Sequence, residues 1–138
     1  FQDCIQEVMD FTSRHKEDQD FGPDCKLLFK AVQATGDFAL HYMQYLKDGR
    51  LQLIPLSSTR FLGCFTEVKM AQSILEQGLI AREKLAGVDA GSSDGIFYRG
   101  KIETAKYFCR NILPNVFARY TALQQEDTSA VDIPEEAF

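Results

Sequence analysis

Apolar residues recur at three- and four-residue spacing along four stretches of the chain, a pattern that predicts four amphipathic helices. Pro23 and Pro55 stand where a helix accepts proline in its first turn, and glycine closes the second and third helices at Asp48-Gly49 and Ala86-Gly87. The expected helices cover approximately residues 2–14, 23–47, 55–85 and 97–123.

The pattern also predicts irregular points. Pro114 lies inside the fourth helix and cannot donate the backbone N–H of a regular turn, so we expect a kink near Arg110. The sequence VDAGSSDG, residues 88–95, is rich in Gly and Ser and predicts a flexible loop before this helix. On the second helix, the stripe expected to face the core includes Met43 and Leu46.

Period-two alternation, which would indicate a strand, has one candidate, LQLI at residues 51–54. A chain of 138 residues has the length of one domain and buries enough surface to fold without disulfides or metals. Four helices with short links therefore predict an all-α fold, an up-down-up-down four-helix bundle. We expect the bundle in residues 1–125 and an irregular acidic C-terminal tail in residues 126–138.

The formal net charge of −5 comes from the tail, whereas the rest of the chain is electrically balanced. Because basic and acidic residues balance before the tail, the sequence predicts no basic surface that would attract nucleic acid or anionic lipid. No run approaches 18 consecutive apolar residues, so no membrane span is predicted. The five acids of the tail, which carries no Lys or Arg, are Glu126, Asp127, Asp132, Glu135 and Glu136.

Residues that could carry chemistry are sparse. A di-iron bundle needs Glu-x-x-His pairs, and neither His15 nor His41 follows a glutamate at that spacing. Phosphate-binding glycine motifs and the G-x-S-x-G nucleophile motif are also absent from the sequence. We therefore expect no catalytic, cofactor-binding or metal-ligating residue in this chain.

The cysteines are far apart in sequence and form no C-x-x-C pair. Widely spaced cysteines usually behave as small buried apolar residues in proteins of a reducing compartment, and this favours a cytoplasmic location. A disulfide is the alternative. The four are Cys4, Cys25, Cys64 and Cys109.

The segment FYRGKIETAKYFCRNILP, residues 97–114, differs from an ordinary bundle helix. Gly100 and Ala105 suggest a strip of small residues between aromatic side chains, where another backbone could approach closely. Lys101 falls on the apolar stripe and needs water or a carboxylate for its ammonium group. One interpretation is a docking face for another domain, formed by Tyr98, Gly100, Lys101 and Phe108. The other is a lysine that reaches solvent beside a glycine at a tight helix crossing, and the residues alone leave both open.

The same segment resembles the C-terminal signature of a subgroup of acyl-CoA dehydrogenases. The shared features are FYRGKIETAKYF at residues 97–108 and ILP at 112–114. Pro55-Leu56 with RFLG at 60–63, and the ending DIPEEAF at 132–138, agree with the same subgroup. It includes the long bacterial enzymes related to 3-methylmercaptopropionyl-CoA dehydrogenase, which carry an extra helical domain after the catalytic core.

The resemblance implies an enzyme that oxidises acyl-CoA to trans-2-enoyl-CoA with FAD. In that family a glutamate removes the α-proton, the β-hydride passes to the flavin, and electrons leave through electron-transfer flavoprotein. Both the glutamate and the flavin site belong to the upstream core, so the resemblance implies no FAD in this segment alone. It also implies a homo-oligomer, and the start at Phe1 rather than Met fits a segment cut from a longer chain.

The expected role of the segment is domain docking or oligomer assembly, through contacts with the upstream core of the same chain. The alternative is a free-standing helical protein-interaction module without an enzymatic role. A bundle that binds a small ligand itself would require convergent polar residues, and the sequence offers no such cluster.

Overall fold

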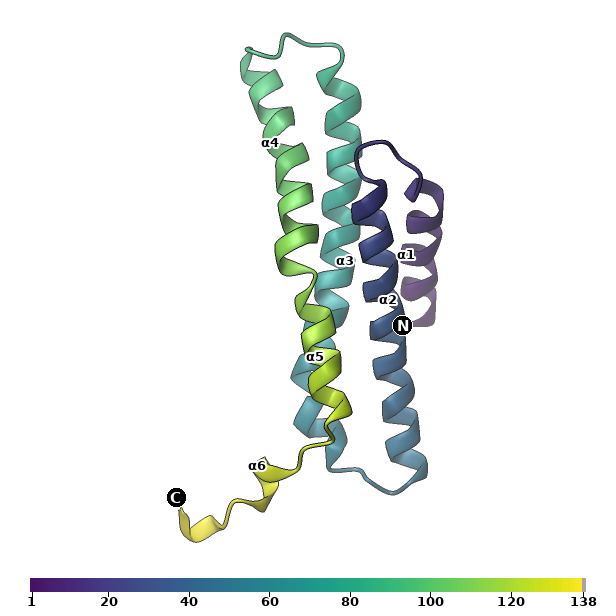
Figure 1. Ribbon diagram of the computed structural model, residues 1–138, viewed down its shortest axis with the longest axis vertical. Coiled ribbons are helices and arrows are strands. Elements are labelled where there is room, and N and C mark those ends of the chain that lie inside the picture. Colours follow the sequence, from purple (N-terminus) through teal and green to yellow (C-terminus); the bar gives the residue numbers. More distant parts are fainter. Residues whose placement is uncertain (138) are drawn as a thin grey trace.

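Helices account for most of the computed structural model, which describes residues 1–137 (Figure 1). No strand occurs among these residues, and the predicted all-α class is confirmed. The tail's last residue, Phe138, lies outside the described residues. The helices are α1 (Gln2–His15), α2 (Gly22–Lys47), α3 (Leu53–Leu85), α4 (Ser93–Tyr107), α5 (Asn115–Gln124) and α6 (Ser129–Asp132). A π-helical turn (Phe108–Ile112) joins α4 to α5, and a 3-10 turn (Glu135–Ala137) follows α6.

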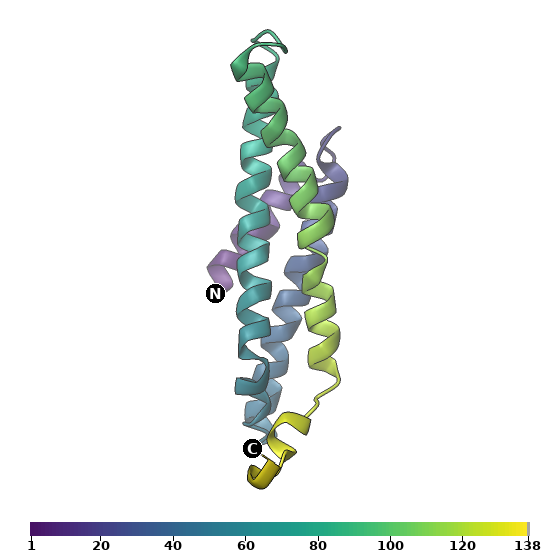
Figure 2. The ribbon, with the colours of Figure 1, turned by 90° about the vertical axis from the view of Figure 1, so that its left-hand side faces the viewer.

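Three long arms lie lengthwise against one another: α2, α3, and the arm formed by α4 and α5 (Figures 1 and 2). Along the chain, α1, α2, α3 and the α4–α5 arm run in alternating directions (Figure 1). However, α1 has 14 residues against 33 in α3, and it packs mainly on α2. A regular up-down-up-down four-helix bundle is therefore not confirmed, because the long arms continue beyond α1.

The helix α1 and the three long arms all contribute buried side chains to one core. Its largest fully buried side chains include Phe21, Leu28 and Phe38 before and within α2, and Leu75 in α3. Burial of an aliphatic or aromatic side chain of this kind contributes about 1.5–3 kcal/mol. Smaller buried residues let the arms approach: Ala31, Ala71, Ala105 and the thiols of Cys25, Cys64 and Cys109.

Local backbone chemistry accounts for the end of α2 and the start of α3. Gly49 has a φ of +72°, the left-handed conformation that favours glycine, and the Arg50 N–H donates to the Tyr45 carbonyl at 2.9 Å. The candidate strand LQLI is not a strand: it forms a turn and then enters α3 at Leu53. Pro55 consequently lies in the first turn of α3, as predicted.

The predicted loop at residues 88–95 is shorter than expected. Ser92 caps α4, because its hydroxyl oxygen accepts a hydrogen bond from the Gly95 N–H at 3.1 Å. Gly95 is buried against the preceding turn, where a Cβ would lie 2.3 Å from the Asp89 carbonyl oxygen. The Gly- and Ser-rich composition thus reflects a helix cap and a close backbone contact as well as a loop.

The irregularity predicted near Arg110 is present as the π-helical turn. The Leu113 N–H donates to the Phe108 carbonyl, five residues back, at 3.0 Å. Pro114 explains the change, because its ring clashes with the carbonyl one turn earlier and it has no N–H to donate. The arm changes direction at this point (Figure 2).

Residues 126–137 leave the bundle below α5, on the side away from α1 (Figure 1). They form only the single turns α6 and the 3-10 turn, and they contain no buried residue. Glu126 has a φ of +49° and its carboxylate pairs with Arg50. The division into a bundle at 1–125 and a tail at 126–138 remains a prediction.

Candidate docking surfaces

The described residues hold no group of three or more His, Cys, Asp or Glu side chains that could bind a metal ion. The two histidines are engaged within helices: the ring of His15 stacks on Phe11 at 4.8 Å, and His41 Nδ1 lies 2.9 Å from the Asp37 carbonyl oxygen. Within residues 1–137 no helix is both long enough and apolar enough to cross a bilayer.

All four cysteines are free thiols in the structure. Burial raises the pKa of the Cys25 and Cys109 thiols to about 12, and carboxylates including Asp24 add to the shift. Thiols in this state are protonated at neutral pH and are poor nucleophiles. Cys25, Cys64 and Cys109, the three buried cysteines, therefore serve as packing residues.

The predicted docking residues do not all lie on one face. Lys101 reaches across to α3, where its ammonium donates to Gln77 Oε1 at 2.8 Å and lies 5.6 Å from the Phe97 ring centroid. Tyr98 and Phe108 are half-buried beside α3 and the core. Lys101 thus behaves as a lysine whose ammonium group reaches polar partners.

Gly100 points away from this group. A Cβ at Gly100 would meet no atom within 4 Å, whereas Ala105 is fully buried. The expected strip of small residues formed by Gly100 and Ala105 is therefore wrong, because five residues turn a helix to its opposite face. The tight crossing lies at Gly78 of α3, whose Cβ would stand 3.0 Å from the Ala105 Cβ and 2.9 Å from Phe21 Cζ.

Gly100 belongs instead to an exposed surface on the outer side of α4. We define the α4 face by four residues that helical spacing brings together and that are all exposed: Ile96, Phe97, Gly100 and Tyr107. Isolated exposed apolar residues are ordinary, but Ile96 and Phe97 flank the open Gly100 at four- and three-residue spacing, and Tyr107 lies two turns further along the same side of the helix.

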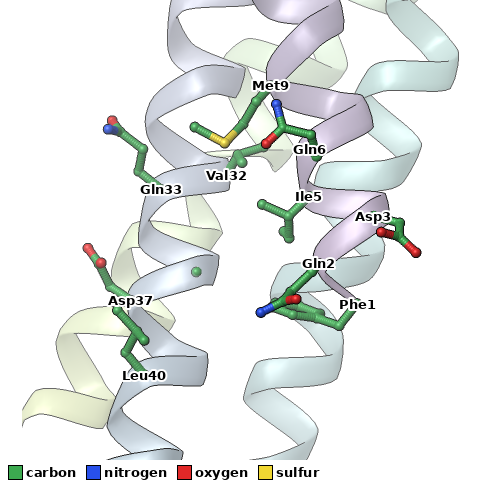
Figure 3. Close-up of a pocket in the computed structure, with 11 residues that line it drawn as sticks. Phe1, Gln2, Asp3, Ile5, Gln6, Met9, Val32, Gln33, Asp37 and Leu40 are labelled. Atoms are coloured by element: carbon green, nitrogen blue, oxygen red, sulfur yellow. The ribbon is translucent and has the colours of Figure 1, made fainter.

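A second surface, not foreseen from the sequence, runs between α1 and α2 (Figure 3). Its first part is an open, mainly apolar groove of about 800 Å³, in which Ile5 and Met9 of α1 face Val32 and Leu40 of α2. Phe1 lines the same part. We call the whole surface the α1–α2 groove.

Its second part has a volume of about 420 Å³ and surrounds the half-buried Phe29 with three lysines, Lys16, Lys26 and Lys30. Gln33 lines both parts, so they adjoin at this residue; Asp3 and Asp37 are the charged side chains that line the first part, and lysines are those that line the second. The signal in the sequence that could have indicated this groove is the set of apolar residues Phe29, Val32 and Leu40 of the second helix, which line it. Met43 and Leu46, expected in the core, are exposed in that helix.

Ion pairs between distant segments hold these surfaces in place. Arg82 of α3 donates to both Asp18 oxygens at 2.6 and 2.7 Å, which fastens the α1–α2 loop to α3. This hydrogen bonding, together with the Phe21 and Asp20 backbone N–H groups, holds the pKa of the Asp18 carboxyl far below its ordinary value, although partial burial opposes the shift.

A second bidentate pair connects the π turn to α2. Arg110 donates from Nε and Nη2 to the two oxygens of buried Asp24, at 2.8 and 2.9 Å. On the opposite side of α1, the buried Gln72 amide joins Glu7 and Glu76, and Lys69 completes the network. The orientations of α1 and the α4–α5 arm are thus fixed by polar contacts as well as by the core.

Taken together, the fold and its surfaces define an all-α domain with two exposed apolar surfaces and three buried thiols. The chain belongs to the family described as acetyl-CoA dehydrogenase C-terminal like, which matches residues 4–134. The family resemblance carried by residues 97–114 is thereby confirmed, and it extends through the first two helices.

The relatives have substantial identity along the chain. It is 33% identical over 134 residues to a butyryl-CoA dehydrogenase of Syntrophomonas wolfei, covering 97% of this chain and 22% of that protein. It is 31% identical over its full 138 residues to another butyryl-CoA dehydrogenase of that bacterium, again covering 22% of the relative. It is 28% identical over 119 residues to the broad-specificity linear acyl-CoA dehydrogenase FadE5 of Mycobacterium tuberculosis, covering 19% of that protein. The chain thus spans about a fifth of the length of these relatives.

Proposed function

We propose that this domain is an accessory part of an FAD-dependent acyl-CoA dehydrogenase that oxidises acyl-CoA to trans-2-enoyl-CoA. The observation that carries the proposal is the match of the whole chain to a fifth of each butyryl-CoA dehydrogenase. The remaining four fifths of such a protein leave ample length for a catalytic core. We place the enzyme in the cytoplasm, with electron-transfer flavoprotein as its electron acceptor.

The described residues do not fit a flavin dinucleotide. A glycine that cradles a phosphate must leave space beside its Cα, and the two buried glycines at helix starts leave none. A Cβ at Gly22 would stand 2.8 Å from the Lys16 carbonyl oxygen, and Gly95 is closed in by Asp89. Flavin binding and the catalytic base are therefore assigned to the upstream core.

The role of this segment is domain docking or oligomer assembly, with the α4 face as the contact surface. The exposed Ile96 and Phe97 beside the open Gly100 support this role, because apolar side chains next to a glycine allow close packing against a second surface. Tyr98 and Lys101 contact the Phe97 ring and position it, whereas Phe108 packs against the core. The upstream core of the same chain is the proposed partner, in a homo-oligomeric enzyme.

Isolating the natural polypeptide with an antibody against this domain tests the enzyme assignment. Its length and its absorption spectrum are recorded. A much longer, yellow protein with flavin bands, active on an acyl-CoA, is expected. A colourless polypeptide no longer than the present chain would overturn the proposal and favour a free-standing interaction module.

The docking role requires a separate experiment on the full-length protein. Tyr107→Asp places a carboxylate in the α4 face, and Leu62→Asp on α3 is the matched control, because the two side chains are 61% and 62% exposed. We expect the Tyr107→Asp variant to form a smaller assembly, measured by light scattering. We also expect it to contain less bound flavin per chain. Equal behaviour of the two variants would contradict docking at α4.

A further inference from the structure

The α1–α2 groove changes character along its length, and this change restricts what can bind in it. At one end Lys16, Lys26 and Lys30 surround Phe29. At the other end the floor is apolar, and the carboxylates of Asp3 and Asp37 line it. A matching segment must therefore present apolar side chains followed by acidic ones, with the acids directed toward the lysines.

The tail of this same chain has that composition. Val131 and Ile133 are 55% and 48% exposed, in a segment without a buried residue. Two carboxylates follow directly, at Glu135 and Glu136, and the tail carries no lysine or arginine. Within its own copy the tail leaves the bundle on the side away from α1, and it lies apart from the groove (Figure 1).

We infer that the α1–α2 groove of one copy binds the acidic tail, residues 127–137, of a second copy of this chain. Val131 and Ile133 occupy the apolar end, and Glu135 and Glu136 reach the three lysines. This inference goes beyond the function proposed above, since it requires two copies of the chain but no flavin-bearing core.

The dimensions of the two partners agree. From Lys26 to Leu40 the groove follows α2 for about 21 Å, at the rise of an α-helix. The contact requires the single turns at Ser129–Asp132 and Glu135–Ala137 to unwind. Eleven extended residues reach at most about 36 Å, so the unwound segment 127–137 can run the length of the groove. The separation of about 10 Å between Ile133 and Glu136 in an extended chain matches about 9 Å along α2 between Val32 and Lys26.

Electrostatics give the pairing its orientation. The three lysines attract Glu135 and Glu136 at their end of the groove, whereas Asp3 and Asp37 disfavour the reverse orientation, which would place both glutamates at the apolar end. Lys26 already lies 3.5 Å from Glu17, but both side chains are exposed, so exchanging Glu17 for a tail carboxylate costs little. If two copies exchange tails about a twofold axis, each dimer contains the contact twice.

Zero-length carbodiimide cross-linking of the natural protein tests the inference, since this reagent joins a lysine amine to a carboxylate in direct contact. A covalent dimer on a denaturing gel is expected, with Lys16, Lys26 or Lys30 joined to Glu135 or Glu136 by mass spectrometry. Tail peptides joined only within a monomer, joined to a different protein, or not joined to the groove would each overturn it.

A charge exchange separates this contact from non-specific association. Lys30→Glu should reduce the covalent dimer at least about threefold, and adding Glu135→Lys and Glu136→Lys to that variant should restore it. Lys47→Glu is the matched control, because Lys47 is an exposed lysine of α2 outside the groove. An equal reduction by the control, or failure of the exchange to restore the dimer, would overturn the assignment even if flavin content is unchanged.

Discussion

At the residue scale, two glycines on neighbouring helices have opposite surroundings. Gly78→Ala would place a methyl group 2.9 Å from Phe21 Cζ and 3.0 Å from the Ala105 Cβ, so α3 and α4 must separate. We expect a loss of about 1–3 kcal/mol in the free energy of unfolding. Gly100→Ala meets nothing within 4 Å and should stabilise the helix by about 0.5–1 kcal/mol. Chemical denaturation of both variants measures their free energies of unfolding. Equal changes in the two variants would contradict a tight helix crossing at Gly78.

The same two glycines show what the sequence could predict. The glycine content and the aromatic spacing of residues 97–108 were visible, and a tight crossing was one of the two interpretations. Which glycine lies in the crossing depends on the rotation of α4 against α3. That rotation is set by Ala105 packing opposite Gly78, a contact between residues 27 positions apart that a one-dimensional pattern does not encode.

Asp18 makes stability depend on pH. Its carboxyl pKa is lowered in the folded protein, so the stabilisation is present above the ordinary pKa near 4 and is lost as the pH falls below it. Asp18→Asn should cost about 1.5–3 kcal/mol at pH 7, the usual value for a hydrogen bond to a charged group. The difference between the variant and the wild type should shrink as the pH falls below about 4. Thermal unfolding at a series of pH values tests this, and a constant difference would argue against the Arg82 pair.

At the scale of elements, the π turn depends on its contact with the start of α2. Arg110→Gln removes the bidentate partner of buried Asp24 and should cost about 3 kcal/mol, because an unpaired buried carboxylate remains. Lys26→Gln removes a pair whose two side chains are both exposed and should change stability by less than about 1 kcal/mol. Urea unfolding of the two variants compares them. Similar losses would indicate that the Asp24 pair contributes no more than a surface contact.

The positions of the elements followed closely from the apolar pattern, and their ends followed less closely. Pro114 predicted the irregularity because its effect is local and covalent. The start of α4 was missed by four residues, since Ser92 acts as a cap only through its hydrogen bond to Gly95. The α1–α2 groove was missed because it depends on how α1 lies against α2, which the pattern of one helix does not give. Met43 and Leu46 were wrongly expected in the core because α1 is too short to cover the end of α2, so both remain exposed although they continue the helical stripe.

At the scale of the whole molecule, the bundle should be independent of its tail. Truncating the chain after Gln125 deletes, among the described residues, one exposed ion pair, between Glu126 and Arg50, and no buried side chain. In the full-length protein we expect the helical circular dichroism signal to be retained and the midpoint of thermal unfolding to move by less than about 3 °C. A larger fall at low protein concentration, where copies are separate, would show that the tail belongs to the fold of a single copy.

The π turn also divides the long arm into two parts with different neighbours. Above it, α4 packs along α3, and below it, α5 packs between α2 and α3 (Figure 2). Segments with different packing partners can exchange their amide protons as separate cooperative units. Hydrogen–deuterium exchange should therefore give α4 and α5 different protection, with their boundary at residues 108–114, so that one covalently continuous arm behaves as two foldons.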